Sequence, residues 1–249
     1  MGTIEFRGIK KSFGPKHVLR GVDLDVQKGQ VFFIIGQSGA GKSVMVKHLI
    51  GLLRPDEGRI YLDGVDITDL SEQEFYPIRK RCAMVFQNST LFDSMSLLEN
   101  VVLPIRKHLD VSMKQAQEMA HEKLRLVGMD AFADSYPADF GDGMRKKVAI
   151  ARALTLDPEF VIFDEPTTGI DPISAAMVDK LIRHLSDNLG VTSIVISHDL
   201  RSIFGIADRI AMLYKGKLML DGTQDDFRHS EDPIVQQFIN GRPDGPMEI

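Results

Sequence analysis

A glycine-rich loop ending in lysine and serine stands between an apolar run and a segment of helical spacing. Its residues match the phosphate-loop pattern G-x-x-x-x-G-K-S/T and are Gly36, Gln37, Ser38, Gly39, Ala40, Gly41, Lys42 and Ser43. Glycines let the backbone approach phosphates, whose charge is met by N–H groups at a helix N-terminus. Lys42 suits the β- and γ-phosphates of a nucleoside triphosphate, and the Ser43 hydroxyl suits Mg²⁺. A glycine turn with a chance Lys-Ser pair is the alternative, which the flanking strand and helix disfavour.

Two adjacent carboxylates follow another apolar run, residues 160–163. Asp164 and Glu165 are therefore expected at the carboxyl edge of a sheet, where α/β proteins bind their ligands. Asp164 is suited to the Mg²⁺ shell through water, and Glu165 can act as general base on an attacking water. Acids that merely face solvent are the alternative. Together with the phosphate loop, the pair predicts binding and hydrolysis of ATP with Mg²⁺.

The elements that must position these groups have the apolar pattern of a buried parallel sheet. Continuous β-forming runs occur at 31–35, 83–86, 160–163 and 193–196, separated by segments of helical spacing. Near the N-terminus, alternating apolar and polar residues predict two half-buried strands joined by the Phe13-Gly14-Pro15 turn. These patterns predict an α/β layered core.

The chain divides into segments of different pattern. Between residues 91 and 154 the β-forming runs give way to helical patterns, for example at 113–127 and 144–154, which predicts an inserted helical subdomain. Residues 209–214 and 217–220 predict a hairpin turned by Lys215-Gly216, and the Gly/Pro-rich end predicts an extended tail. The predicted segments are 1–90 and 155–233 for the two parts of the core, 91–154 for the helical subdomain, and 234–249 for a C-terminal extension.

Composition narrows the function classes. The chain of 249 residues carries a net charge of −5, so there is no global basic field and we expect no nucleic-acid partner. The single Cys82 lies in an apolar run and predicts a buried structural thiol. No run approaches the length of a membrane span, and the N-terminus lacks the apolar core of a secretion signal. The remaining histidines and the twelve methionines show no metal-ligand spacing that predicts a site.

The order of these motifs resembles the ABC ATPase family over nearly the whole chain. Gln87 follows the run 83–86 as the Q-loop glutamine does, Asp171 lies in the D-loop position, and His198 follows the last apolar run. The resemblance implies an α/β ABC ATPase fold, in which a RecA-like parallel-sheet core carries an antiparallel β subdomain and an inserted α-helical subdomain. It also implies that Gln87 contacts Mg²⁺ and the attacking water, that His198 holds the γ-phosphate, and that Phe13 stacks on adenine. A core role for Phe13 is the alternative.

The segment that matches the family's signature departs from it. Where the family has Leu-Ser-Gly-Gly-Gln, this chain has Phe140, Gly141, Asp142, Gly143 and Met144. In the family this segment reaches the γ-phosphate bound to a partner subunit. Gly141 lacks the serine hydroxyl, and Asp142 adds negative charge near the phosphates. Asp142 either slows hydrolysis or caps the following helix and points away.

A subgroup resemblance is carried by three stretches, which are residues 85–101, 143–147 and 238–246. They look like the ATPases of Mla/Mce-type phospholipid transporters, where Met144 also replaces glutamine. The resemblance implies a homodimer of ATPase subunits bound to permease subunits and a lipid-binding MCE protein. It implies a peripheral position on the cytoplasmic face of a bacterial inner membrane, and movement of phospholipid between inner and outer membranes.

Other functions stay open at this point. One alternative is the ATPase of a polar-solute ABC importer, and another is a nucleotide-binding assembly or regulatory module with weak hydrolysis. A non-transport ABC ATPase acting on DNA or ribosomes is disfavoured by the single nucleotide domain and the absence of a basic stripe. The apolar residues Ile234, Val235, Phe238 and Ile239 at helical spacing are suited either to a neighbouring subunit or to the chain's own core.

Overall fold

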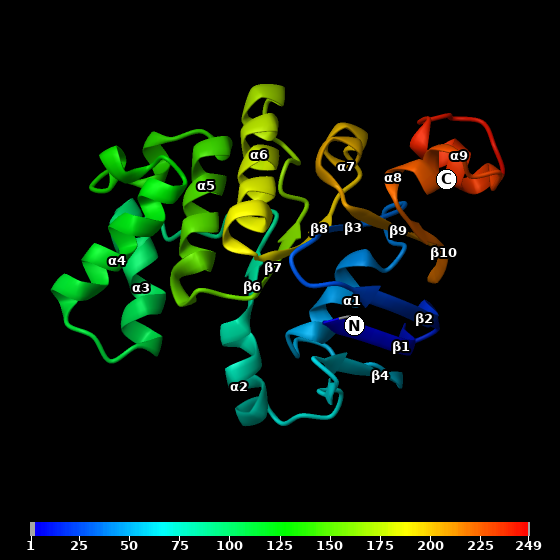
Figure 1. Cartoon of the computed structure of the whole chain (residues 1–249), viewed down its shortest axis with the longest axis horizontal. Helices are drawn as coiled ribbons and strands as arrows, with labels where there is room; N and C mark the ends of the chain where they lie inside the picture. Colours follow the sequence, from blue (N-terminus) through cyan, green and yellow to red (C-terminus); the bar gives the residue numbers. More distant parts are fainter. Residues whose placement is uncertain (1–2, 249) are drawn as a thin grey trace.

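The computed structural model describes residues 3–248, whose larger sheet runs through the middle of the molecule (Figure 1). Within these residues the strand order is β10-β9-β3-β8-β7-β6, parallel from β9 to β6 with β10 antiparallel to β9. The bounds are β3 Val31–Ile35, β6 Cys82–Val85, β7 Phe160–Asp164, β8 Thr192–Ile196, β9 Arg209–Tyr214 and β10 Lys217–Gly222. Each predicted apolar run forms one of these strands. Residues 1, 2 and 249, which belong to the predicted first and last segments, lie outside the described residues.

Strand β3 shows why its sequence is apolar throughout. Phe33 and Ile35 pack into a core shared with the helices on one face of the sheet, whereas Phe32 and Ile34 pack into a second core on the other face. All of these side chains are fully buried. A strand covered on both faces cannot alternate with polar residues, so the continuous run is the expected pattern.

A smaller antiparallel sheet covers the second core. Within the described residues its order is β2-β1-β4-β5, and its bounds are β1 Ile4–Phe13, β2 Lys16–Val26, β4 Glu57–Leu62 and β5 Val65–Asp66. The turn after Phe13 joins β1 and β2 as the alternation predicts, with Phe13 opposite Lys16. Helix α1, Lys42–Leu49, contributes Met45 and Leu49 to the core between the two sheets.

In Figure 1 the helices of residues 97–153 lie at the left of the view, and those of residues 200–239 lie at the upper right. The bounds are α2 Glu72–Arg81, α3 Leu97–His108, α4 Met113–Leu126, α5 Asp142–Ala153, α6 Pro172–Leu189, α7 Leu200–Ile206, α8 Gln224–Arg228 and α9 Pro233–Ile239, with short 3-10 turns at Asp130–Phe132, Pro137–Asp139 and Leu154–Leu156. Ser96 and Ser112 begin α3 and α4 with capping boxes, which satisfy the first N–H groups of both helices. The helices α3, α4 and α5 share one apolar core with the sheet.

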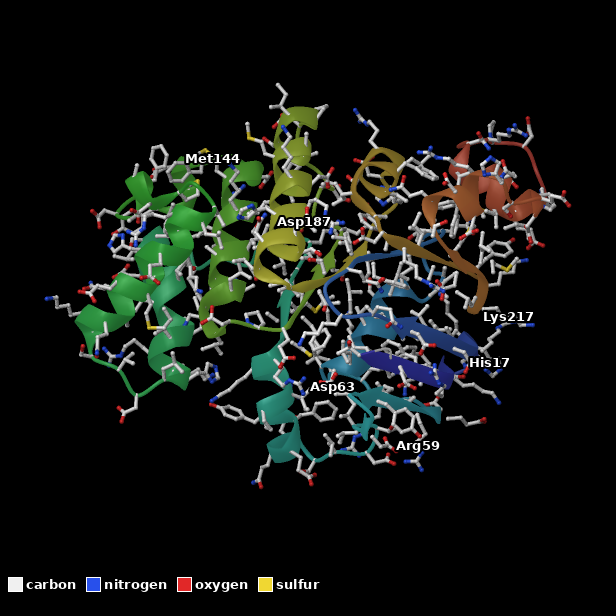
Figure 2. The ribbon with its side chains drawn as sticks, viewed as in Figure 1. His17, Arg59, Asp63, Met144, Asp187 and Lys217 are labelled. Atoms are coloured by element: carbon white, nitrogen blue, oxygen red, sulfur yellow. The ribbon has the colours of Figure 1, made fainter. Side chains whose placement is uncertain are left out.

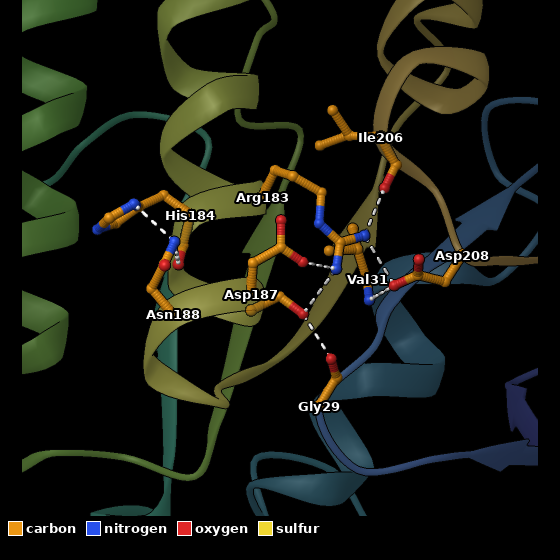
Figure 3. Close-up of polar contacts among 9 residues, drawn as sticks. Gly29, Val31, Arg183, His184, Asp187, Asn188, Ile206 and Asp208 are labelled. Atoms are coloured by element: carbon orange, nitrogen blue, oxygen red, sulfur yellow. Dashed lines mark hydrogen bonds and ion pairs between the residues drawn. The ribbon is translucent and has the colours of Figure 1, made fainter.

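Arg183 ties helix α6 to the amino edge of the larger sheet (Figure 3). Its guanidinium donates to Asp208 Oδ2 at 2.8 Å and to Asp187 Oδ1 at 2.6 Å. Asp208 Oδ2 also accepts from the Val31 amide at 2.7 Å, where β3 begins. The hydroxyl of Ser186 donates to the Gly29 carbonyl at 2.5 Å. The start of β3, and with it the loop that follows, is therefore held to α6.

The C-terminal segment folds back on its own domain. Val235 of α9 is fully buried, and Ile234, Phe238 and Ile239 pack against the same core. Beyond them, the Met247 amide donates to Gln237 Oε1 at 2.7 Å and the Glu248 amide to the Tyr214 hydroxyl at 3.0 Å. The prediction of an extended tail is therefore wrong, because residues 241–246 form an exposed turn that returns Met247 to the core.

Two further predictions concern burial. Cys82 is 3 % exposed, and burial raises the pKa of its thiol to about 12, as expected of a structural cysteine. Among residues 3–248, no helix combines the length and apolar character that a bilayer crossing demands.

Candidate functional site

The phosphate loop lies between β3 and α1, at the carboxyl edge of the larger sheet. Gly36 has φ +137°, and a Cβ there would lie 2.1 Å from the Leu213 carbonyl oxygen. Gly41 has φ +103° and begins α1 without a side-chain cap, so the first N–H groups of this helix remain available to an anion. Gly39, at φ +79°, faces open space. Sterics therefore demand glycine at Gly36 and Gly41 and leave the middle of the loop open.

Lys42 turns its ammonium back into this loop. The side chain is buried, and Nζ donates to the Gly36 carbonyl at 2.7 Å and to the Gln37 carbonyl at 3.1 Å. Burial lowers the pKa of Lys42, and the nearby carboxylates of Glu165 and Asp164 act in the opposite direction. A cation held among backbone dipoles at a helix N-terminus favours a ligand with negative charge.

Ser43 and Asp164 meet although they are far apart in sequence. The Ser43 hydroxyl donates to Asp164 Oδ1 at 3.0 Å. Gln87 lines the same cavity of about 390 Å³, together with Phe13 and the phosphate loop. A hydroxyl, a carboxylate and an amide oxygen around one space are the hard donors that Mg²⁺ prefers, with water completing its shell. The residues present therefore fit Mg²⁺.

Glu165 is held by two hydrogen-bonding partners. His198 Nδ1 lies 2.9 Å from Glu165 Oε2, and the Thr168 hydroxyl donates to the same oxygen at 3.0 Å. The Glu165 backbone has φ +52°, in the left-handed region that residues with side chains rarely adopt. Its amide donates to the Ile196 carbonyl at 2.9 Å, which keeps the backbone in that conformation. Such strain is typical of functional positions.

Phe13 is 47 % exposed at the tip of the β1–β2 hairpin and lines the cavity. It is therefore not a core residue. Lys11 Nζ lies 5.6 Å from the ring centroid, and the exposed part of the ring is suited to a planar ligand. Lys16, opposite Phe13 in the hairpin, and Val18 also line this cavity. Neither residue was predicted from the sequence, although pairing across the predicted turn indicates Lys16.

Asp171 caps a helix. Its carboxylate accepts from the amides of Ile173 at 2.9 Å and Ser174 at 3.0 Å, at the start of α6. Thr168 was also missed; its signal was its place three residues after Glu165. The loop from Glu165 to Asp171 thus joins the carboxylate at the strand end to a fixed helix start.

The segment from Phe140 to Met144 lies apart from the cavity. None of its residues is among those that line the cavity in the described chain. Figure 2 shows Met144 on the helical side of the molecule and His17, on the hairpin next to Phe13, on the opposite side. One chain therefore does not bring this segment to its own phosphate loop.

The capping role considered for Asp142 is wrong. Gly141 is the N-cap of α5 and makes no side-chain hydrogen bond, whereas Asp142 is the first residue of the helix. Its carboxylate pairs with Arg145 Nη2 at 2.5 Å. A Cβ on Gly143 would lie 2.6 Å from the Ser174 side chain, so glycine is fixed here by contact with α6.

Comparison with known proteins places this geometry in a family. The ABC transporter family matches residues 19–168, which include the phosphate loop, Gln87 and both carboxylates. The chain belongs to the ABC transporter family. It is an ABC-type ATPase that binds ATP and couples its hydrolysis to transport.

Similar proteins cover almost the whole of this ABC ATPase. The intermembrane phospholipid transport system ATP-binding protein MlaF of Haemophilus influenzae is 38% identical over 99% of this chain and 93% of its own length. A probable ribonucleotide transport ATP-binding protein, mkl, of Mycobacterium leprae is 38% identical over 98% of this chain and 71% of its own length. A solved dimer of the ATP-binding cassette MJ0796 with ADP and Pi has a TM-score of 0.80 and 29% identity, over 88% of this chain and 98% of that one.

Proposed function

We propose that this ABC ATPase powers the movement of phospholipids between two bacterial membranes, as a subunit of a Mla/Mce-type transport system. The observation that carries the proposal is the match to the Haemophilus phospholipid transport protein over 99% of this chain. That match extends beyond the phosphate loop and the carboxylates, which many ATPases share, into the α8–α9 segment. Similarity in a segment outside the nucleotide site supports a shared transport system.

In the proposed mechanism, the chain's own residues bind and orient the nucleotide. The N–H groups of the phosphate loop and the Lys42 ammonium hold the β- and γ-phosphates, and the Phe13 ring stacks on adenine. Ser43, Gln87 and Asp164 would hold Mg²⁺, which would supply positive charge to the phosphates. Water forms a bond to the γ-phosphorus of ATP, the bond from that phosphorus to the β–γ bridging oxygen breaks, and ADP and phosphate leave.

Glu165 acts as the general base in this proposal. His198 and Thr168 both hold Oε2, so the carboxylate keeps one orientation toward the water that attacks the γ-phosphorus. His198 does not line the phosphate-loop cavity itself but holds Glu165 through Nδ1, and we propose that its other ring nitrogen donates to the γ-phosphate. Gln87, which lines the same cavity as Glu165, positions the same water.

We further propose that two copies of the chain form the working ATPase. The open N-terminus of α5, with Gly141 and Gly143, is suited to the γ-phosphate on a second copy, because the segment lies apart from its own loop. The MJ0796 cassette, which shares the fold, forms a dimer with ADP and Pi bound. Asp171, at the start of α6, would lie in the D-loop between the copies.

The proposed assembly places the dimer on the cytoplasmic face of an inner membrane, bound to a permease and a lipid-binding MCE protein. The test is to tag the full chain, isolate its membrane complex, and identify both the copurifying proteins and the lipid exchanged in proteoliposomes. We expect a permease, an MCE protein and ATP-dependent phospholipid movement. A complex that moves no lipid would overturn the proposal.

A polar-solute transporter is the second candidate, and the name of the mycobacterial relative favours it, because that protein is called a ribonucleotide transport protein. The same proteoliposomes, loaded with labelled ribonucleotides, separate the two candidates. ATP-dependent ribonucleotide movement with no phospholipid movement would support the second. A weakly hydrolysing assembly module would bind ATP with little turnover and drive neither.

A further inference from the structure

Helix α5 carries a buried ammonium whose role the proposed mechanism does not explain. Lys146 is 2 % exposed, one turn into the helix that begins with the Gly141–Met144 segment. Its Nζ donates to the Phe86 carbonyl at 3.2 Å and also to the carbonyl of Gln87. Lys146 thus contacts the backbone of a residue assigned to the attacking water.

Burial of this charge is unfavourable for stability. Within residues 3–248 its hydrogen-bond partners are these two neutral carbonyls, because Asp142, the acid one turn away, pairs with Arg145 instead. Burial lowers the pKa of Lys146, and the more distant charges of Asp142 and Asp164 only partly oppose it. An apolar side chain of similar length would fill the space without desolvating a cation.

The Phe86 and Gln87 carbonyls lie just beyond the end of β6, where the hydrogen bonds between strands stop. Strand β6, at the edge of the sheet, ends at Val85, and residues 86–96 form an irregular loop. Lys146 donates to the carbonyls of the first two residues of that loop, Phe86 and Gln87. Arg152, six residues further along α5, donates to the Ser89 carbonyl at 3.2 Å and the Thr90 hydroxyl at 3.0 Å. Two cations of α5 therefore hold the same loop.

Lys146 also lies between Gln87 and the Gly141–Met144 segment, which is proposed to reach the γ-phosphate on a second copy. It lines a cavity of about 440 Å³ with Gln87, Asp142 and the Thr168–Ile170 loop. Because α5 begins only four residues before Lys146, a shift of the Gly141–Met144 segment moves the ammonium, and the ammonium moves the Gln87 backbone. Lys146 Nζ thus links the start of α5 directly to the backbone of Phe86 and Gln87.

We propose that Lys146 is a positioning residue, which fixes the Gln87 backbone to the start of α5 and so aligns Gln87 for hydrolysis when that helix engages a second copy. The proposal rests on the role assigned to Gln87 in the proposed function. It predicts that Lys146 acts on turnover through Gln87, and that ATP binding is left to the phosphate loop.

The test is a double-mutant cycle between Lys146→Met and Gln87→Ala, measured as steady-state ATPase of the full chain in its isolated membrane complex. We expect Lys146→Met to lower kcat about tenfold with KM for ATP within about twofold, because methionine keeps the packing but removes the donor. In the Gln87→Ala background the same change should lower kcat less than about twofold. A merely structural lysine would give additive effects.

Two controls keep the result interpretable. Lys147→Met changes the neighbouring lysine, which is half-buried and not engaged with these carbonyls, and should leave kcat unchanged. Lys146→Gln restores a neutral donor and should recover at least about threefold in kcat over Lys146→Met. If Lys146→Met does not fold, two cycles are measured instead, one pairing Lys146→Gln with Gln87→Ala and one pairing Lys146→Ala with Gln87→Ala.

The outcomes distinguish the proposed role of Lys146 from the proposed role of Gln87. If Gln87→Ala lowers kcat and Lys146→Met lowers it further by its full factor, the Lys146 proposal is overturned while the role of Gln87 stands. If Gln87→Ala leaves kcat unchanged, the role of Gln87 fails and the Lys146 proposal fails with it. Non-additive loss, with recovery by glutamine, supports the proposal.

Discussion

At the amino edge of the larger sheet, Arg183 meets two carboxylates, whereas at the carboxyl edge Lys42 is buried among the carbonyls of its own loop. Arg183 is paired with Asp187 and Asp208 within the fold, and Asp208 also accepts a hydrogen bond from the Val31 amide. Within residues 3–248, Lys42 is held without a direct ion pair, in a loop whose helix N-terminus has no side-chain cap. The charges at the amino edge of the sheet thus stabilise the fold, whereas those at the carboxyl edge are suited to binding a ligand. We expect substitutions at the two edges to separate stability from activity.

The largest effect is expected at the carboxyl edge. Glu165→Gln keeps the size of the side chain but removes the general base, so kcat of the isolated complex should fall about 1000-fold. ATP affinity, measured by equilibrium binding, should stay within about threefold, because the phosphate loop is untouched. Glu231→Gln, at an exposed glutamate that does not line the cavity, is the matched control. Equal turnover of Glu165→Gln and wild type would remove Glu165 from the mechanism.

The amino edge should respond in the opposite way. Arg183→Met removes the donor shared by Asp187 and Asp208 and should lower the free energy of unfolding by about 2 kcal/mol, as read by urea denaturation. Both acids are partly exposed, so water limits the loss. The kcat per folded molecule should stay within about twofold of wild type. Arg201→Met, at an arginine that is 81 % exposed, should leave the unfolding free energy unchanged; a large kcat loss for Arg183→Met would contradict the division between the edges.

Much of this arrangement could be predicted from the sequence, because its signals are local. The phosphate loop, the buried strands and the acids after β7 each show in a short run of residues. The meeting of Ser43 with Asp164 follows from assigning both residues to Mg²⁺. The contact of Lys146 with the Gln87 backbone could not be predicted, because it joins positions 59 residues apart and no local pattern marks it. The β4–β5 pair was missed because residues 57–66 are largely polar and half-exposed. The segment boundaries at residues 90, 154 and 233 stay predictions.

A smaller effect is expected beside the hairpin at the far edge of the sheet. Met247 is 8 % exposed against the chain's own core, and Lys215 Nζ lies 2.7 Å from Glu248 Oε2 nearby. Met247→Ala should therefore lower the free energy of unfolding by about 1 kcal/mol, less than a central core methionine would. Recovery of the membrane complex should be unchanged. Loss of the complex with unchanged stability of the isolated chain would instead assign the tail to a neighbouring subunit.

The smallest effect is expected from the Gly141–Met144 segment, which is proposed to reach the nucleotide bound at the carboxyl edge of a second copy. Gly141→Ser together with Asp142→Gly restores a hydroxyl and removes a carboxylate near the phosphates of the partner site. Because Asp142 is exposed and paired with Arg145, its repulsion is partly screened, and kcat of the complex should rise only about threefold. Asp142→Asn alone isolates the charge, and Gly141→Ser alone isolates the hydroxyl. If the double variant shows no gain, the segment does not limit turnover. The charge that matters at this edge is then the one supplied by each chain's own loop.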